Sequence, residues 1–222
     1  MAQQETMTYR EYLFPHLDDK KLYEQRYNEL YLNPAYHDLP VRTWMKKFHP
    51  KACSSILELG AGGGANLIYL AKLGHTCDGV EIAQNAVDAF HRKLETEPPH
   101  FQQRVSLVQG WIEDFCPEKQ YDYVICCEVL EHVIDPVKIL EVLKRCLKPE
   151  GTGYITAPTF RNPQDSRHVR VVYEATMVKW TDEVGLQITW SEQTSRRVYC
   201  FVKPIPEGEG ANDGHPSVGG AE

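Results

Sequence analysis

The chain has 222 residues, of which 42% are hydrophobic and 25% charged, as is typical of a globular domain of ordinary size. Its formal net charge of −7 argues against a protein that holds nucleic acid by the phosphate backbone, because such binding needs a basic face. No apolar run approaches the ~18 residues that span a bilayer, and the first residues lack a secretory signal, so we expect a cytoplasmic protein.

Residues 8–49 carry tyrosine, leucine and charged side chains at helical spacing, with interruptions at Pro34 and Pro40. This pattern predicts two helices and a loop, and we expect residues 1–50 to form a helical extension to the main domain. The extension carries a row of tyrosines, Tyr9, Tyr12, Tyr23, Tyr27 and Tyr31. We predict that it forms part of a lid over a site, although an aromatic stripe more often marks ordinary packing.

From residue 54 onward, short apolar runs alternate with helical segments. The runs that predict strands cover residues 54–60, 75–82, 104–110, 121–128, 151–158, 186–194 and 196–204. Helices are predicted near residues 64–73, 84–96 and 135–147. This alternation implies a parallel sheet with helices on both faces. The last two runs are too close together for a helix between them, which predicts an antiparallel hairpin.

The expected architecture is therefore a Rossmann-like, doubly wound α/β fold. It has a mostly parallel seven-stranded sheet, a C-terminal antiparallel hairpin and the N-terminal helical extension. The main domain is predicted to span residues 51–204. Residues 205–222 contain four acids, no Lys or Arg, and many Gly and Pro, which predicts a disordered acidic tail. The seven cysteines are scattered without a C-x-x-C pair, so we expect them to serve packing.

The glycine-rich stretch GAGGGA at residues 60–65 lies between a predicted strand and a predicted helix. Glycine turns in this setting bring the backbone close to a dinucleotide. Glu81 ends the next strand, about 20 residues on, where a carboxylate can accept hydrogen bonds from ribose hydroxyls. These features fit NAD and other adenosine ligands equally, and a turn that serves only close packing is the remaining alternative.

Three features count against NAD. Glu58 precedes the glycines by two residues, where a carboxylate suits a positively charged amino group better than a pyrophosphate. The terminal hairpin is foreign to the dinucleotide-binding sheet. Tyr199 and Lys203 give a Tyr-x-x-x-Lys spacing, but in one strand they would be more than ~10 Å apart, too far to act together as a proton donor.

The motifs taken together resemble those of the class I S-adenosylmethionine (SAM)-dependent methyltransferases. The matching stretches are ELGAGGGAN, GVEI, QGWIEDF, YDYVICCEVLEHVIDP and LKPEGTGYITAP. The resemblance implies SAM as cofactor and assigns it to Glu58, Gly60, Gly62, Gly64, Glu81, Ile82, Trp111, Ile112 and Cys127. In that assignment Glu58 holds the methionine end and Glu81 the ribose, while Cys127 lies under the sulfonium. Many relatives have an acid in place of Trp111, so adenine recognition here is expected to use stacking, backbone groups or Glu113.

The stretch EVLEH at residues 128–132 places two carboxylates and an imidazole at the carboxyl edge of the sheet. These groups can cap the next helix, supply a general base or bind a divalent cation. We predict Glu131 and His132 as catalytic residues, with His132 as the base for an oxygen acceptor. The stretch also resembles the Mg²⁺-binding motif of the ubiquinone-biosynthesis O-methyltransferases. RNA 3′-terminal 2′-O-methyltransferases add a later histidine, so the implied metal ligands are Glu128, Glu131, His132 and His168.

The interpretation that these motifs favour is a methyltransferase that methylates an oxygen of a small-molecule acceptor. Methylation of an RNA 3′ end with a divalent metal is the first alternative, so a nucleic-acid partner stays open despite the acidic charge. A SAM-binding partner subunit without catalysis and an NAD-dependent oxidoreductase are the others. The sequence carries no readable pattern for the acceptor or for the oligomeric state.

Overall fold

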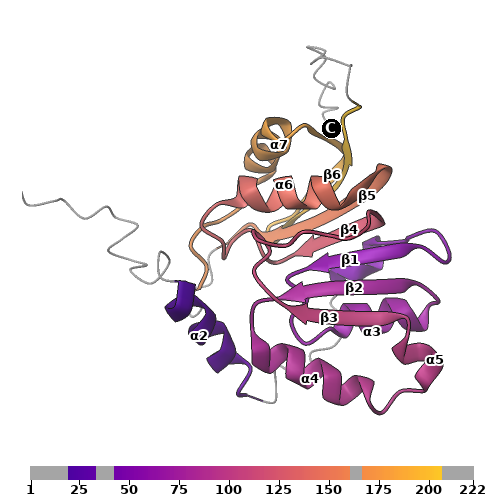
Figure 1. Cartoon of the computed structure of the whole chain (residues 1–222). Helices are drawn as coiled ribbons and strands as arrows, with labels where there is room; N and C mark the ends of the chain where they lie inside the picture. The colour runs from indigo at the N-terminus through magenta and orange to yellow at the C-terminus, as the bar shows by residue number, and fades with distance from the viewer. Residues whose placement is uncertain (1–19, 34–42, 161–166, 207–222) are drawn as a thin grey trace, which may run out of the picture.

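The computed structural model describes residues 20–33, 43–160 and 167–206 (Figure 1). The first predicted helix of the extension, with Tyr9 and Tyr12, and the predicted tail from residue 207 on lie outside the described residues. The predicted domain bounds at residues 50 and 204 therefore stay predictions. No described helix is long and apolar enough to cross a membrane.

The seven strands form one sheet in the order β3-β2-β1-β4-β5-β7-β6. Strands β1 to β5 are parallel to one another, whereas β7 is antiparallel to both β5 and β6. The strands are β1 Ser55–Leu59, β2 Thr76–Glu81, β3 Val105–Gln109, β4 Tyr121–Cys127, β5 Leu147–Pro158, β6 Leu186–Gln193 and β7 Arg197–Pro204. This topology confirms the predicted fold class, including the closing hairpin.

Helices cover both faces of the sheet, with α3, α4 and α5 on one side and α6 and α7 on the other (Figure 1). The helices are α2 Lys20–Leu30, α3 Ala65–Lys72, α4 Gln84–Leu94, α5 Pro99–Gln102, α6 Pro136–Cys146 and α7 Glu174–Glu183, with a 3₁₀ helix η2 at Thr43–Lys47. Successive residues of β1 point into the two opposite cores, Ile56 with α3 and α4, and Leu57 with α6. The central strands are thus buried on both faces, which explains their continuous apolar runs.

Strand β5 begins at Leu147, four residues before the predicted start. Its early residues are extended because Pro149 disfavours the helical conformation of the residue before it, so α6 has to end. Leu147 then pairs with Tyr121, and a register shift follows between Tyr121 and Tyr123. Helices α5 and α7 were not predicted from the sequence.

The segment between β4 and α6 is held by the segment that follows β5. The Arg170 guanidinium donates hydrogen bonds to the backbone carbonyls of Leu130, Val133 and Ile134, and Val169 N–H donates to the Glu131 carbonyl at 2.9 Å. Because these carbonyls belong to an irregular loop, no regular ladder satisfies them. Arg170 therefore fixes the loop that carries the predicted catalytic residues.

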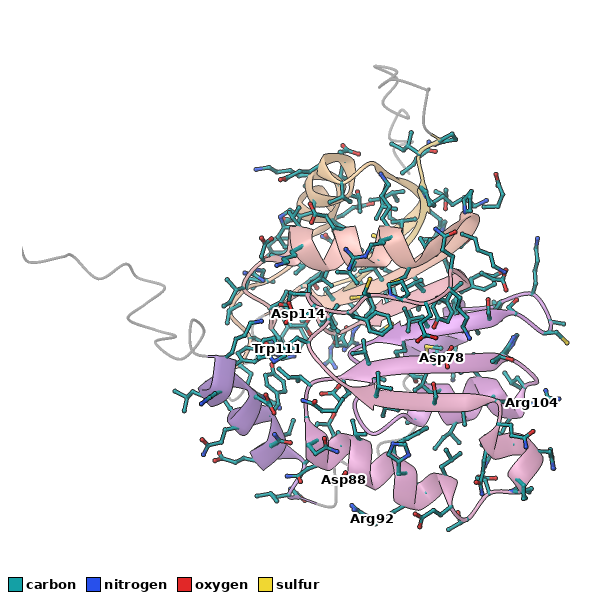
Figure 2. All side chains as sticks on the ribbon, in the orientation of Figure 1. Asp78, Asp88, Arg92, Arg104, Trp111 and Asp114 are labelled. Atoms are coloured by element: carbon teal, nitrogen blue, oxygen red, sulfur yellow. The ribbon has the colours of Figure 1, made fainter. Side chains whose placement is uncertain are left out.

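We expect Arg170→Met to lower the free energy of unfolding by about 3 kcal/mol or more, because three hydrogen bonds from a charged donor are lost. Urea unfolding monitored by circular dichroism measures this. Arg92→Met is the matched control, since Arg92 projects into solvent from α4 (Figure 2). Equal stability of the two variants would show that the Arg170 contacts do not hold the loop.

Candidate active site

A cavity of about 500 Å³ opens at the carboxyl ends of β1, β2 and β4, and α2 lies beside it (Figure 1). Open α/β sheets bind their ligands at this edge. The predicted cofactor residues that line the cavity are Glu58, Gly60, Gly62, Glu81, Ile82, Trp111, Ile112 and Cys127. Gly64 does not line it. The structure thus brings together residues that are up to 69 positions apart in the sequence.

The glycine turn forms the floor of the cavity. Gly60, Gly62 and Gly64 have φ values of 76°, 54° and 71°, in the left-handed region that residues other than glycine rarely adopt. A Cβ on Gly64 would lie 2.3 Å from Cδ2 of Phe90, so this glycine allows α3 to pack closely on α4. Gly60 and Gly62 line the cavity, and a Cβ there would lie 2.6 Å from Cγ2 of Val129 and 2.5 Å from the Tyr31 hydroxyl, respectively.

Two buried acids flank the turn in different surroundings. The Glu58 carboxyl accepts a hydrogen bond from Asn66 Nδ2 at 2.6 Å, and its Oε2 has no hydrogen-bond partner among the described residues. Burial raises the pKa of Glu58 to about 8. Glu81 accepts from the backbone N–H groups of Gly62 at 2.7 Å and Ala83 at 3.0 Å. Burial raises its pKa too, but these donors oppose the shift.

Trp111 closes one end of the cavity next to α2 (Figure 2). Its ring centroid lies 5.4 Å from that of Tyr23, and Lys20 Nζ lies 4.9 Å from the Trp111 ring while pairing with Asp114 at 2.9 Å. Ile82 packs in the same small apolar cluster. The arrangement offers an aromatic and apolar wall of the kind that suits a flat base.

Helix α2 directs its tyrosines toward the cavity. Tyr23 and Tyr27 line it together with Tyr31, which follows the helix, and the Tyr23 hydroxyl donates to the His132 carbonyl at 3.2 Å. Asn85 donates two hydrogen bonds to Asn28, from its backbone N–H to Oδ1 at 3.0 Å and from Nδ2 to the backbone carbonyl at 2.9 Å, which attach α2 to the first turn of α4. These tyrosines therefore pack against the domain and line the cavity, while a role as a lid stays a prediction.

Glu131, His132 and His168 form a cluster whose potential ligand atoms all lie within 4.8 Å of one another. His132 Nε2 is 3.7 Å from Glu131 Oε1, and its Nδ1 lies 3.2 Å from the Arg167 carbonyl. The rings of His132 and His168 meet edge to face with centroids 4.8 Å apart. Glu131 is fully buried. The structure thus places His168 beside the two predicted catalytic residues.

Glu128 lies outside this cluster because other groups hold its carboxylate. Arg197 binds it through two hydrogen bonds, Nε to Oε1 at 2.9 Å and Nη2 to Oε2 at 2.7 Å, and the Thr156 hydroxyl donates to Oε1 at 3.0 Å. The backbone of Glu128 is left-handed, with φ of 58°. Of the four predicted metal ligands, Glu131, His132 and His168 therefore lie close to one another. Glu128 as a fourth ligand stays a prediction, which its contact with Arg197 does not favour.

Several cavity residues escaped the sequence analysis, namely Asn66, Pro158, Phe160, Arg167 and Arg197. Asn66 stands in the glycine motif, one helical turn from the ligand edge, and could have been noted as a partner for Glu58. Arg197 meets Glu128 across 69 residues, and no local pattern at the start of β7 signals that contact.

Residues 57–155 match a family model described as a methyltransferase domain. The ubiquinone biosynthesis O-methyltransferase of Actinobacillus pleuropneumoniae serotype 7 (strain AP76) is 29% identical over 103 residues, which cover 46% of this chain and 44% of that protein. The Hydrogenovibrio crunogenus enzyme of the same name is 33% identical over 120 residues, 53% and 48% of the two chains. The chain thus spans about half the length of the curated relatives it matches.

Among solved structures, an O-methyltransferase (NcsB1) from neocarzinostatin biosynthesis, in complex with SAM and 2-hydroxy-5-methyl naphthoic acid, superposes with a TM-score of 0.64. It is 15% identical and covers 86% of this chain and 60% of that one, a likeness that shows the fold. The matched domain, the motifs and the strand order together make this chain similar to the class I SAM-dependent methyltransferases over residues 57–155.

Proposed function

We propose that the chain binds SAM in the cavity and transfers its methyl group to an oxygen of a small-molecule acceptor. The observation that carries the proposal is that one cavity is lined both by the glycine turn with Glu58 and Glu81 and by the Glu131–His132 pair. The groups proposed to bind the cofactor and those proposed to accept a proton thus line the same cavity.

The cofactor would lie across the carboxyl edge of the sheet. Glu58 would receive the ammonium of the methionine part, and Glu81 the ribose hydroxyls. The base would lie against Trp111 and Ile112, with Cys127 below the sulfonium. The bare backbone of the glycine turn allows the ligand to approach closely, and the buried Glu58 carboxyl, whose Oε2 has no hydrogen-bond partner among the described residues, supplies a place for a cationic group.

An oxygen acceptor is supported by the two relatives described above, which are both named O-methyltransferases. The reaction is an in-line displacement: the acceptor oxygen forms a bond to the methyl carbon while the carbon–sulfur bond breaks. The electron pair of that bond stays on sulfur and yields S-adenosylhomocysteine. Holding the two reactants in line contributes about 7–11 kcal/mol to lowering the barrier.

The acceptor proton would pass to His132. Because the Arg167 carbonyl can only accept a hydrogen bond, Nδ1 of His132 carries the proton and Nε2 of the neutral ring keeps its lone pair. Glu131, at 3.7 Å from Nε2, would stabilise the imidazolium that forms. A positioned base of this kind contributes about 10²- to 10⁴-fold. Mg²⁺, the ion that the resemblance implies, would lower the pKa of an acceptor hydroxyl when bound at this cluster.

A second candidate is 2′-O-methylation of an RNA 3′ end. The position of His168 beside Glu131 and His132 favours it, because the added histidine is the feature that the resemblance to RNA enzymes predicted. The net charge of −7 counts against it. Methyl transfer to a short RNA with a free 3′ diol, and none to catechols, would establish this candidate in place of the first.

We expect S-adenosylhomocysteine to bind with micromolar affinity in a calorimetric titration, and NAD to give no heat. Glu81→Ala should weaken that affinity about 10- to 100-fold, because a charged hydrogen-bond acceptor for the ribose and for the glycine turn is lost. Glu95→Ala, an exposed position at the end of α4, is the matched control. Binding of NAD alone would contradict the proposal. If S-adenosylhomocysteine binds but no acceptor is methylated, the result would favour the alternative of a SAM-binding partner protein without catalysis.

The affinity for S-adenosylhomocysteine should also rise with pH. In the free protein Glu58 has a pKa of about 8, so below that pH its carboxyl is mostly protonated and must lose the proton to pair with the ligand ammonium. Between pH 6 and 7.5 we expect affinity to rise about 20-fold and to level off above pH 8. Glu58→Gln should bind more weakly, with a flat profile. A wild-type profile equally flat over this range would place the ammonium elsewhere.

A further inference from the structure

We propose that Asn66 is a ligand-binding residue, whose Oδ1 receives the ammonium group of the cofactor together with Oε2 of Glu58. Through its Nδ2 donor, Asn66 also positions Glu58 for this contact. The inference rests on the proposed function for the place of the cofactor. It deepens that function, because it adds a second residue to the ammonium site and names the ligand group that this residue recognises.

The first argument is a pair of buried oxygen atoms. Glu58 Oε2 and Asn66 Oδ1 are both buried and have no hydrogen-bond partner among the described residues. Both side chains belong to residues that line the cavity. A buried polar atom without a partner is costly, so native proteins rarely contain one without a reason. Because both atoms are acceptors, a ligand that satisfies them has to bring donors.

The second argument is the contact between the two side chains. Asn66 Nδ2 donates to Glu58 Oε1 at 2.6 Å, which keeps the second oxygen of each side chain close to the other residue. An ammonium group has three N–H donors, so a single ammonium would satisfy both oxygens and keep one donor. A hydroxyl group has one donor and no charge, and would satisfy only one of them.

The third argument is the charge around Glu58. This side chain is only 2% exposed, and burial raises its pKa to about 8. The negative charge of Glu81 on β2 raises that pKa as well. The nearby thiols stay neutral because burial raises their pKa; they are Cys77 on β2, and Cys126 and Cys127 on β4. None of these four groups is positive, so an ammonium would meet a carboxylate that they do not compensate.

The amide of Asn66 also acts on the ionisation of Glu58. Its N–H donor stabilises the carboxylate, and therefore lowers the pKa of Glu58 against the larger effect of burial. Without this donor the pKa would rise further, and less of the protein would carry the carboxylate at neutral pH. Asn66 thus acts on the ligand in two ways, directly through Oδ1 and indirectly through the charge of Glu58.

The place of Asn66 in α3 supports a role outside the helix. Asn stabilises helices mainly at the N-cap position, and inside a helix it is less favourable than Ala or Leu. In α3 the N-cap residue is Gly64, which makes no side-chain capping hydrogen bond, and Asn66 is the second helical residue. Its side chain turns to Glu58 on β1. This contact, rather than helix stability, accounts for the residue.

The test compares two ligands by calorimetry on the full chain at pH 8. They are S-adenosylhomocysteine and its deaminated analogue, in which hydrogen replaces the amino group. Asn66→Leu removes both polar atoms of the amide. We expect it to weaken S-adenosylhomocysteine at least ~10-fold, because a hydrogen bond to a charged group is lost. The analogue should change by less than about threefold, since it has no group that shares the contact.

The matched control is Gln103→Leu, which also replaces an amide by leucine but at an exposed position just after α5. It should change neither affinity. Thermal melting checks that each variant folds. Asn66→Ala, which suits a helix, replaces Asn66→Leu if that variant does not fold.

The pH profile between pH 6 and 8.5 tests the effect on Glu58, which a purely structural role would not produce. In the wild type the affinity for S-adenosylhomocysteine should level off above pH 8. In Asn66→Leu it should still rise at pH 8.5, because the pKa of Glu58 rises when the donor is lost. The expected upward shift of the profile is about one pH unit. The analogue has no ammonium, so its affinity should not rise with pH in either protein.

Three results would overturn the inference: an affinity for S-adenosylhomocysteine that Asn66→Leu leaves unchanged or increases, an equal loss for both ligands, or a profile that levels off at the same pH as in the wild type. An equal loss would mean that Asn66 only supports the glycine turn. If the wild type binds neither ligand, the proposed function itself fails, so the two failures are distinguishable.

Discussion

The backbone from Glu128 to Ile134 is the part of the molecule on which the cavity depends. It leaves β4 through a left-handed residue and has no regular hydrogen-bond ladder of its own. Three distant segments hold it. Arg170 binds its carbonyls, Arg197 binds the Glu128 carboxylate, and Tyr23 donates to the His132 carbonyl. Because these contacts come from the β5–α7 connection, from β7 and from α2, the predicted catalytic residues are positioned only when the whole chain has folded.

The acids of the cavity differ in how their charge is compensated. This difference determines where in the cavity a cationic group is bound most favourably. Glu58 has burial and one amide donor, so its pKa rises into the neutral range. Glu81 has two backbone N–H donors, and Glu128 has a guanidinium. A cationic ligand group gains most beside Glu58, where no charge compensates the carboxylate once it ionises. The acids are therefore not interchangeable, although the sequence shows them as the same residue type.

Much of the fold was predictable because its signals are local. Apolar runs of strand length, glycines before a helix and an acid at the end of β2 all lie within short windows of sequence. The register of β5, the position of α2 over the cavity and the pairing of Glu128 with Arg197 depend instead on contacts between distant segments. The metal prediction shows this limit most clearly. The EVLEH stretch brought Glu128 and Glu131 together as one motif, but the structure turns the two carboxylates toward different partners.

The difference between local sequence signals and contacts between distant segments also explains why the similarity to the superfamily can be recognised from the sequence while the acceptor cannot. The predicted cofactor residues, from Glu58 to Cys127, all fall within the matched stretch 57–155. Other parts of the cavity wall come from outside that stretch: Tyr23 and Tyr27 of α2, Tyr31 just after it, Phe160 and His168 after β5, and Arg197 on β7. These segments have no shared motif to identify them, and each reaches the cavity only through packing. In the proposed function the acceptor would contact this part of the wall, so the choice of acceptor would depend on segments where sequence patterns are weakest and on the side-chain chemistry of the cavity itself.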